Sequence, residues 1–267
     1  TMVRDATTAH WTGGQGPILG QSVLDIVNAS LSALGPFLPL RELRPFDVYI
    51  FPSSADMRSA LGQGETALGD DDLLEMGVLF VTSVNSQTAE SDLAQSIPYE
   101  LAHLLLYRAA GSKYSAVPWW LREGIAISAR PSRNPRHEDL LAGAMQSEQT
   151  IPLWRLCSEP QEMGDRKELA GAQSAALVRF IAETRPTGTI PELAASYIDG
   201  DNCEEGVKRV LGVSLDDLEE QWLRSQQTPS GARSLFNDII IWIGLFLAGT
   251  FLVFLLYRAN QRKGAKS

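Results

Sequence analysis

Three side chains in the stretch SIPYELAHLLLY, residues 96–107, have types and a spacing that could do hydrolytic chemistry. If the stretch is helical, Tyr99 and His103 share one face, and Glu100 lies beside them. Two histidines at this spacing bind the metal in zinc hydrolases, and the glutamate polarises the metal-bound water. Here the first position holds Tyr99. Taken alone, Glu-x-x-His more often belongs to an ordinary core helix with a buried histidine.

A second carboxylate follows in VPWWLREGIAISA, residues 117–129, where Glu123 stands twenty residues after His103. A carboxylate on a neighbouring antiparallel helix is what a His, His, Glu metal site needs as its third ligand. The pair Trp119 and Trp120 opens this second helix. We expect this apolar pair to belong to the core between the two helices rather than to a substrate cleft.

Together, these stretches resemble the gluzincin zinc metallopeptidases, specifically the peptidase MA-like group. Its members typically show a His-Glu-x-x-His helix followed by a Trp-Leu-x-Glu-Gly helix. The sequence FDVYIFPSSADMRSAL resembles the strand and helix that precede the active-site helix, and residues 173–223 resemble the family's helical tail. The resemblance covers about residues 8–225. It implies zinc ligation by His103 and Glu123, and general base and acid work by Glu100 on a zinc-bound water.

The chain departs from this family pattern at Tyr99, which makes the first ligand position degenerate. A phenol with a reference pKa near 10 must lose its proton to bind a metal, whereas a neutral imidazole binds at pH 7. We therefore expect zinc affinity to be severely reduced or lost. Of the other histidines, only His137 is a candidate replacement, and its basic, proline-bearing loop is typical of a surface. A second departure is Gly171, near which many family members carry a tyrosine that could steady an oxyanion.

Two functions stay open from the sequence. The chain is a membrane-anchored metallopeptidase homologue whose family activity is zinc-dependent peptide bond hydrolysis, or it is a catalytically inactive pseudo-peptidase that acts as a binding or assembly module. Either function implies a peptide or protein substrate or partner outside the membrane. Nucleic acid is not expected, because the net charge is −9 and the last ten residues hold four basic and no acidic side chains, which leaves −13 on residues 1–257.

A mainly apolar run of 18 consecutive residues without a charge, 239–256, predicts a transmembrane helix. At a rise of about 1.5 Å per residue it nearly spans a hydrocarbon core of roughly 30 Å. We place the membrane-spanning segment at residues 235–257, in contact with the lipid bilayer, after a polar linker at residues 227–234. The tail at residues 258–267 is basic, so the positive-inside rule places it in the cytoplasm and residues 1–226 outside the cell membrane.

The elements that must position the candidate residues predict an α+β fold. Strand patterns occur at residues 4–11, 46–51 and 77–84, with helical patterns at 18–34 and 53–61. Helix then follows helix, at roughly 90–110, 118–130, 136–147, 166–184, 190–198, 203–211 and 214–226. We expect a zincin-like domain with a small N-terminal sheet and a mainly helical C-terminal half, then a single transmembrane helix.

The two cysteines, Cys157 and Cys203, both fall in the domain that is placed outside the membrane. A disulfide and a pair of buried free thiols are both compatible with this pattern.

Overall fold

A computed structural model describes residues 1–11, 17–38, 44–62, 74–82, 89–160 and 164–227 of the chain. The chain divides into two compact units, Thr1–Glu219 and Glu220–Ser267. Among the described residues, no helix is both long and apolar enough to cross a membrane. The transmembrane segment expected at residues 235–257 and the basic tail at 258–267 lie outside the described residues.

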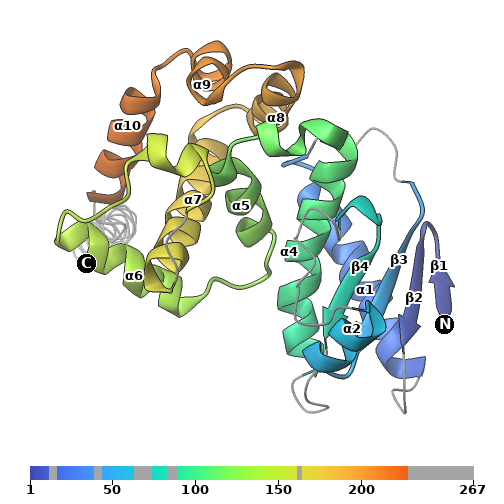
Figure 1. Cartoon of the computed structure of the whole chain (residues 1–267). Helices are drawn as coiled ribbons and strands as arrows, with labels where there is room; N and C mark the ends of the chain where they lie inside the picture. Colours follow the sequence, from blue (N-terminus) through green and yellow to red (C-terminus); the bar gives the residue numbers. More distant parts are fainter. Residues whose placement is uncertain (12–16, 39–43, 63–73, 83–88, 161–163, 228–267) are drawn as a thin grey trace, which may run out of the picture. The chain divides into compact units, whose positions relative to one another are not determined.

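A four-stranded sheet forms the N-terminal part of the first unit (Figure 1). Its strands are β1 (Met2–Arg4), β2 (Thr7–Trp11), β3 (Phe46–Phe51) and β4 (Leu79–Thr82), in that spatial order. The first pair is antiparallel and the other two pairs are parallel. The strand predicted at residues 4–11 is confirmed over β2, but its first residues are not part of β2, because Asp5 adopts a φ of +50° in the turn between β1 and β2. Aspartate tolerates this left-handed conformation better than most residues.

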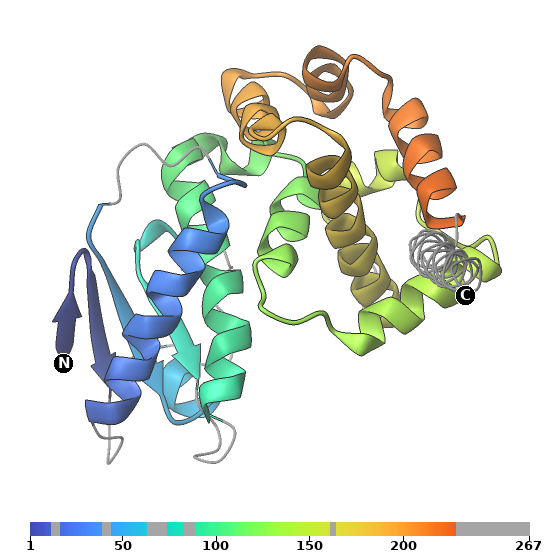
Figure 2. The same cartoon turned by 180° about the vertical axis from the view of Figure 1, so that it is seen from behind.

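Two long helices, α1 (Pro17–Leu34) and α4 (Ala89–Ala110), pack on each other and on the sheet (Figures 1 and 2). Residues that alternate along the strands, such as Val48 and Val81, are buried, as expected for a sheet with one covered face. Along α4 the fully buried residues recur at helical spacing: Leu93, Ile97, Leu101 and Leu104. Because this stripe is buried, Tyr99 and His103 lie on a different face of α4.

The last turn of α4 is tied to the sheet by Arg108. Its guanidinium donates hydrogen bonds to the carbonyl oxygens of Arg44 at 2.7 Å and Gly77 at 2.9 Å, just before β3 and β4. Charged donors make these bonds stronger than neutral ones. Helix α2 (Ser54–Ala60) follows β3 and starts at the N-cap Ser53, whose hydroxyl oxygen accepts from the Asp56 amide.

The remaining elements of the described residues are all helices, as predicted. After the short 3-10 turn η1 (Gly111–Ala116), the elements are α5 (Trp119–Ser128), α6 (Pro135–Gln146), the 3-10 turn η2 (Leu153–Cys157), α7 (Asp165–Thr184), α8 (Thr189–Asp199), α9 (Cys203–Leu211) and α10 (Leu215–Gln227). The α+β plan is therefore confirmed. The expected core role of Trp119 and Trp120 is confirmed too, because both are buried.

Helices α5 and α7 pack closely because α5 carries a glycine at their contact. A Cβ at Gly124 would lie 2.5 Å from the Ser174 carbonyl oxygen of α7, which is closer than real contacts allow. Next to this contact, the buried amide of Gln173 pairs with the Ile151 backbone, accepting from its N–H at 2.8 Å and donating to its carbonyl at 3.0 Å. The position of α5, and hence of Glu123, follows from this packing.

A disulfide joins the two cysteines, so the structure decides between the two alternatives left by the sequence. Cys157 at the end of η2 is bonded to Cys203 at the start of α9. Their Cα atoms are 5.9 Å apart, within the usual range for this bond.

Candidate functional site

Helices α4 and α5 bring three of the predicted site residues together. Tyr99 and His103 lie one turn apart on α4, with ring centroids 4.8 Å apart in an edge-on arrangement. Glu123 reaches them from α5. The Tyr99 hydroxyl donates to both carboxylate oxygens of Glu123, at 3.0 Å to Oε1 and 2.9 Å to Oε2. The His103 Nε2 atom lies 3.7 Å from Glu123 Oε2, too far for a good hydrogen bond.

This cluster is largely removed from solvent. The side chains of His103 and Glu123 are 14% and 17% exposed, and Tyr99 is half-buried. Burial favours the neutral form of Glu123, but electrostatic attraction from His103, the hydrogen bond from the Tyr99 hydroxyl and the charge of Arg130 outweigh it and hold the pKa of Glu123 below its ordinary value. For Tyr99, burial and the Glu123 charge raise the pKa far above that of a free phenol. At neutral pH, a protonated Tyr99 therefore faces an ionised Glu123.

Two further residues, which the sequence did not single out, complete the cluster. The Tyr114 hydroxyl, from η1, is 2.7 Å from His103 Nδ1. The guanidinium of Arg130, just after α5, lies over the Tyr99 ring with Cζ 4.5 Å from its centroid, a cation–π geometry. Neither residue stands at a fixed helical spacing from Tyr99 or His103, so no periodicity pointed to them.

The other predicted residues lie around the cluster. Glu100 follows Tyr99 on α4, is partly exposed, and its charge contributes to the raised pKa of Tyr99. Gly171 of α7 faces Glu123, since a Cβ there would lie 3.8 Å from Glu123 Oε1. Gly171 therefore lies beside the cluster. That a tyrosine at this place would steady an oxyanion stays a prediction.

His137 does not join Tyr99, His103 and Glu123, and it is not the fully exposed residue that its loop suggested. It is half-buried on α6 and lines a neighbouring pocket. Burial and the positive charge of Arg130 lower its pKa. The preceding residues 131–136 are exposed, so the expectation of a surface loop is correct for them.

The residues of the cluster do not fit a catalytic zinc ion. Such ions are held by three protein ligands and keep one position open. Here only His103 and Glu123 are ligands of the usual kind, and both oxygens of Glu123 accept from the Tyr99 hydroxyl. Within the described residues, no three His, Cys, Asp or Glu side chains gather in a way that could hold a metal.

Comparison with protein families gives one match. A family model described as the Peptidase MA superfamily matches residues 31–227. No curated protein and no solved structure matches the chain. The matched range includes α4, η1 and α5, and so every residue of the cluster.

Proposed function

The chain belongs to the Peptidase MA superfamily, and we propose that its site is a gluzincin-type active site converted into a binding site for a peptide or protein. The proposal rests on one observation, the paired hydrogen bonds from the Tyr99 hydroxyl to the Glu123 carboxylate. In the gluzincins that this chain resembles, a histidine at this position and the carboxylate would bind the same zinc ion. In this chain, a phenol takes the histidine's place and satisfies the carboxylate directly.

The pKa shifts of Glu123 and Tyr99 also support a site that does not hold zinc. A buried carboxylate without donors would be costly, and a metal is one way to compensate it. For Glu123 the compensation comes from His103, Tyr99 and Arg130, which together lower its pKa. The raised pKa of Tyr99 makes the phenolate needed for metal binding less accessible. The charges and hydrogen-bonding groups of the cluster are therefore balanced within the protein, without a metal ion.

A second candidate, zinc-dependent peptide bond hydrolysis, is favoured by the environment of His103. Histidines that bind a metal through one nitrogen usually hold a hydrogen-bonding partner on the other. Tyr114 occupies that position on His103 Nδ1, which leaves Nε2 directed toward Glu123. This contact supports the assignment of His103 and Glu123 as two zinc ligands, and Tyr99 is the residue that separates the two candidates.

Zinc content of the full-length chain, purified in a nonionic detergent and incubated with zinc, tests the proposal. We expect no stoichiometric zinc in the wild type, but stoichiometric zinc in Tyr99→His, because a third ligand of the usual kind is then present. The matched control is the double variant Tyr99→His, His103→Ala, which should lose the metal again. Stoichiometric zinc in the wild type that disappears in His103→Ala would overturn the non-catalytic assignment and favour the hydrolase.

The membrane anchor belongs to the proposed function as well. The uncharged run at residues 239–256 and the basic residues after it motivate a single span with the folded domain outside. The Cys157–Cys203 disulfide supports this placement, since disulfides persist in oxidising compartments. Protease added to intact cells should cleave the large domain and leave the C-terminal tail protected. Protection of the large domain would contradict the orientation.

A further inference from the structure

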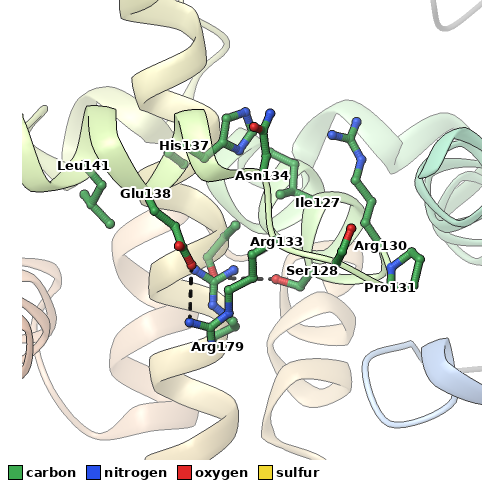
Figure 3. A pocket seen from close by; sticks show the side chains of 13 residues that line it. Ile127, Ser128, Arg130, Pro131, Arg133, Asn134, His137, Glu138, Leu141 and Arg179 are labelled. Atoms are coloured by element: carbon green, nitrogen blue, oxygen red, sulfur yellow. Dashed lines mark hydrogen bonds and ion pairs between the residues drawn. The ribbon is translucent and has the colours of Figure 1, made fainter. Parts of the chain in front are cut away.

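A cavity of about 210 Å³ lies beside the candidate site, walled by α5, α6, α7 and the loop between α5 and α6 (Figure 3). Its polar lining includes three arginines that come from different parts of the fold. Arg130 and Arg133 stand on the loop, and Arg179 projects from α7. The apolar part is supplied by Ile127 and Leu141. The cavity is smaller than the roughly 300 Å³ of a typical small-molecule pocket, so it suits one functional group of a larger ligand.

The charges of the lining do not balance. Two guanidinium groups, those of Arg133 and Arg179, lie near one carboxylate, that of Glu138. Its Oε1 atom is 3.5 Å from Arg133 Nη1, and both of these side chains are mostly exposed. Exposed pairs of this kind contribute little. Because the pKa of His137 is lowered, its ring adds no positive charge at neutral pH. Arg133, Arg179 and Glu138 thus give this part of the pocket a net charge near +1 in a chain whose total charge is −9.

Arg179 is the most informative member of the pocket. It is half-buried, and among the described residues no hydrogen bond or ion pair holds its guanidinium. Burial, followed by repulsion from Arg133, lowers its pKa. Figure 3 shows the Arg133 and Arg179 side chains approaching each other near Glu138. Two guanidinium groups held together at a cost to the folded protein are the arrangement that binds carboxylates and phosphates.

Arg130 connects this pocket to the cluster around Glu123. Its side chain lines the pocket, yet its guanidinium lies over the Tyr99 ring. Figure 3 shows it directed away from Arg133 and Arg179. The Arg130 Nε atom is buried, and within the described part of the chain it has no hydrogen-bond partner. Arg130 is therefore the residue that joins the lining of this pocket to Tyr99.

We propose that this pocket binds a carboxylate of the peptide ligand, with Arg179 and Arg133 as the binding residues and Arg130 as the link to Tyr99 and Glu123. This inference rests on the proposed peptide-binding function and adds the class of ligand, a peptide with a free C-terminal carboxylate or an acidic side chain. The excess positive charge selects such ligands from neutral ones, and the small volume admits one carboxylate group.

Arginine labelling with phenylglyoxal, read by mass spectrometry on the full-length chain in nonionic detergent, tests this assignment without any activity assay. The probes are degenerate N-acetylated hexapeptide libraries. The first has uncharged side chains and a free carboxyl terminus, the second is amidated at its carboxyl terminus and rich in Asp and Glu, and the third has uncharged side chains and is amidated. Inorganic phosphate at matched ionic strength is the fourth arm. At roughly ten times the dissociation constant, a protecting probe should slow labelling of Arg133 and Arg179 about tenfold, because only empty pockets react.

Protection by either carboxylate library, with no protection by the neutral amidated library, supports the proposal and tells which carboxylate is bound. Equal protection by the neutral library, or protection by phosphate alone, overturns it. Arg179→Gln should abolish the protection of Arg133 while leaving the ligand-free protein at least as stable, since it removes a repelled half-buried cation. Arg58→Gln, at an exposed position of α2, is the control. It should change neither the protection of Arg133 nor the stability of the ligand-free protein. These readouts do not depend on zinc, so they fail or succeed separately from the metal test.

Discussion

At the scale of single residues, the Tyr99 hydroxyl is a direct donor to the Glu123 carboxylate, whose ionised state His103 also stabilises. Both oxygens of the carboxylate accept from it, and the carboxylate is only 17% exposed. Replacing Tyr99 by His changes a donor into a metal ligand, whereas replacing it by Phe keeps the ring and removes the donor alone. The second change isolates the hydrogen bond.

We expect Tyr99→Phe to lower the free energy of unfolding by about 1.5–3 kcal/mol at pH 7, the usual effect for a hydrogen bond to a charged group. Urea unfolding measures it. Because the pKa of folded Glu123 lies below the ordinary value of 4.5, this stabilisation is present above 4.5 and is lost as the pH falls toward the lowered pKa. Tyr107→Phe, also on α4 and half-buried, is the control and should cost little. Equal losses in both variants would speak against the pairing.

His137 gives a second prediction at this scale. Burial lowers its pKa below the ordinary 6.5, Arg130 and Arg179 lower it further, and Glu168 and Glu123 oppose the shift. As the pH falls through 6.5, the unfolded chain binds a proton that the folded chain resists, so stability decreases. Thermal unfolding should therefore show a loss of stability on acidification around this pH that is smaller in His137→Gln. An unchanged pH dependence in the variant would show that another group causes it.

At the scale of elements, the contact between α5 and α7 holds Glu123 in place. A methyl group at Gly124 would meet the Ser174 carbonyl oxygen at 2.5 Å, and a backbone atom cannot move aside as a flexible side chain can. Gly124→Ala should therefore destabilise the protein by about 1–3 kcal/mol despite the better helix propensity of alanine. Gly143→Ala on α6 is the matched control. Nothing lies within 4 Å of its Cβ position, so it should gain about 0.5–1 kcal/mol.

Chemical denaturation of the two glycine variants side by side checks this prediction. The change in the free energy of unfolding should have opposite signs in the two variants. Both gain the helix propensity of alanine, but only the methyl group at position 124 meets a neighbouring backbone. A stabilising Gly124→Ala would mean that α5 and α7 can separate without cost, and that the position of Glu123 is less constrained than the packing indicates.

At the scale of the whole molecule, the disulfide closes a loop over a sequence separation of 46 residues that contains α7 and α8. By the loop-closure estimate, this cross-link destabilises the unfolded chain by about 4 kcal/mol. The double variant Cys157→Ser, Cys203→Ser should therefore lose up to that amount in urea unfolding. Reduction of the wild type should give a similar loss, whereas reduction of the double variant should have no effect. Two free thiols in the non-reduced wild type, found by mass spectrometry after alkylation, would contradict the bond.

The sequence by itself indicated most of the elements and singled out three residues of the candidate cluster, Tyr99, His103 and Glu123. Helical spacing placed Tyr99 and His103 on one face, because residues four apart on a helix always do so. The second stretch supplied Glu123, and the resemblance implied that its helix packs beside the first. Alternation and periodicity also gave the α+β plan, but did not reveal the turn at Asp5. These features depend on short segments, whose patterns are legible without knowledge of the rest of the chain.

Only the tertiary structure decided what the cluster is able to do. The hydrogen bonds from Tyr99 to Glu123, the contact of Tyr114 with His103 and the place of Arg130 over Tyr99 all join different elements. Their distances follow from how α4, η1 and α5 pack, and hydrophobic patterns carry no such distances. The arginine pocket is a further case, since Arg133 and Arg179 lie 46 positions apart in the chain and meet only when α7 packs against the loop that precedes α6.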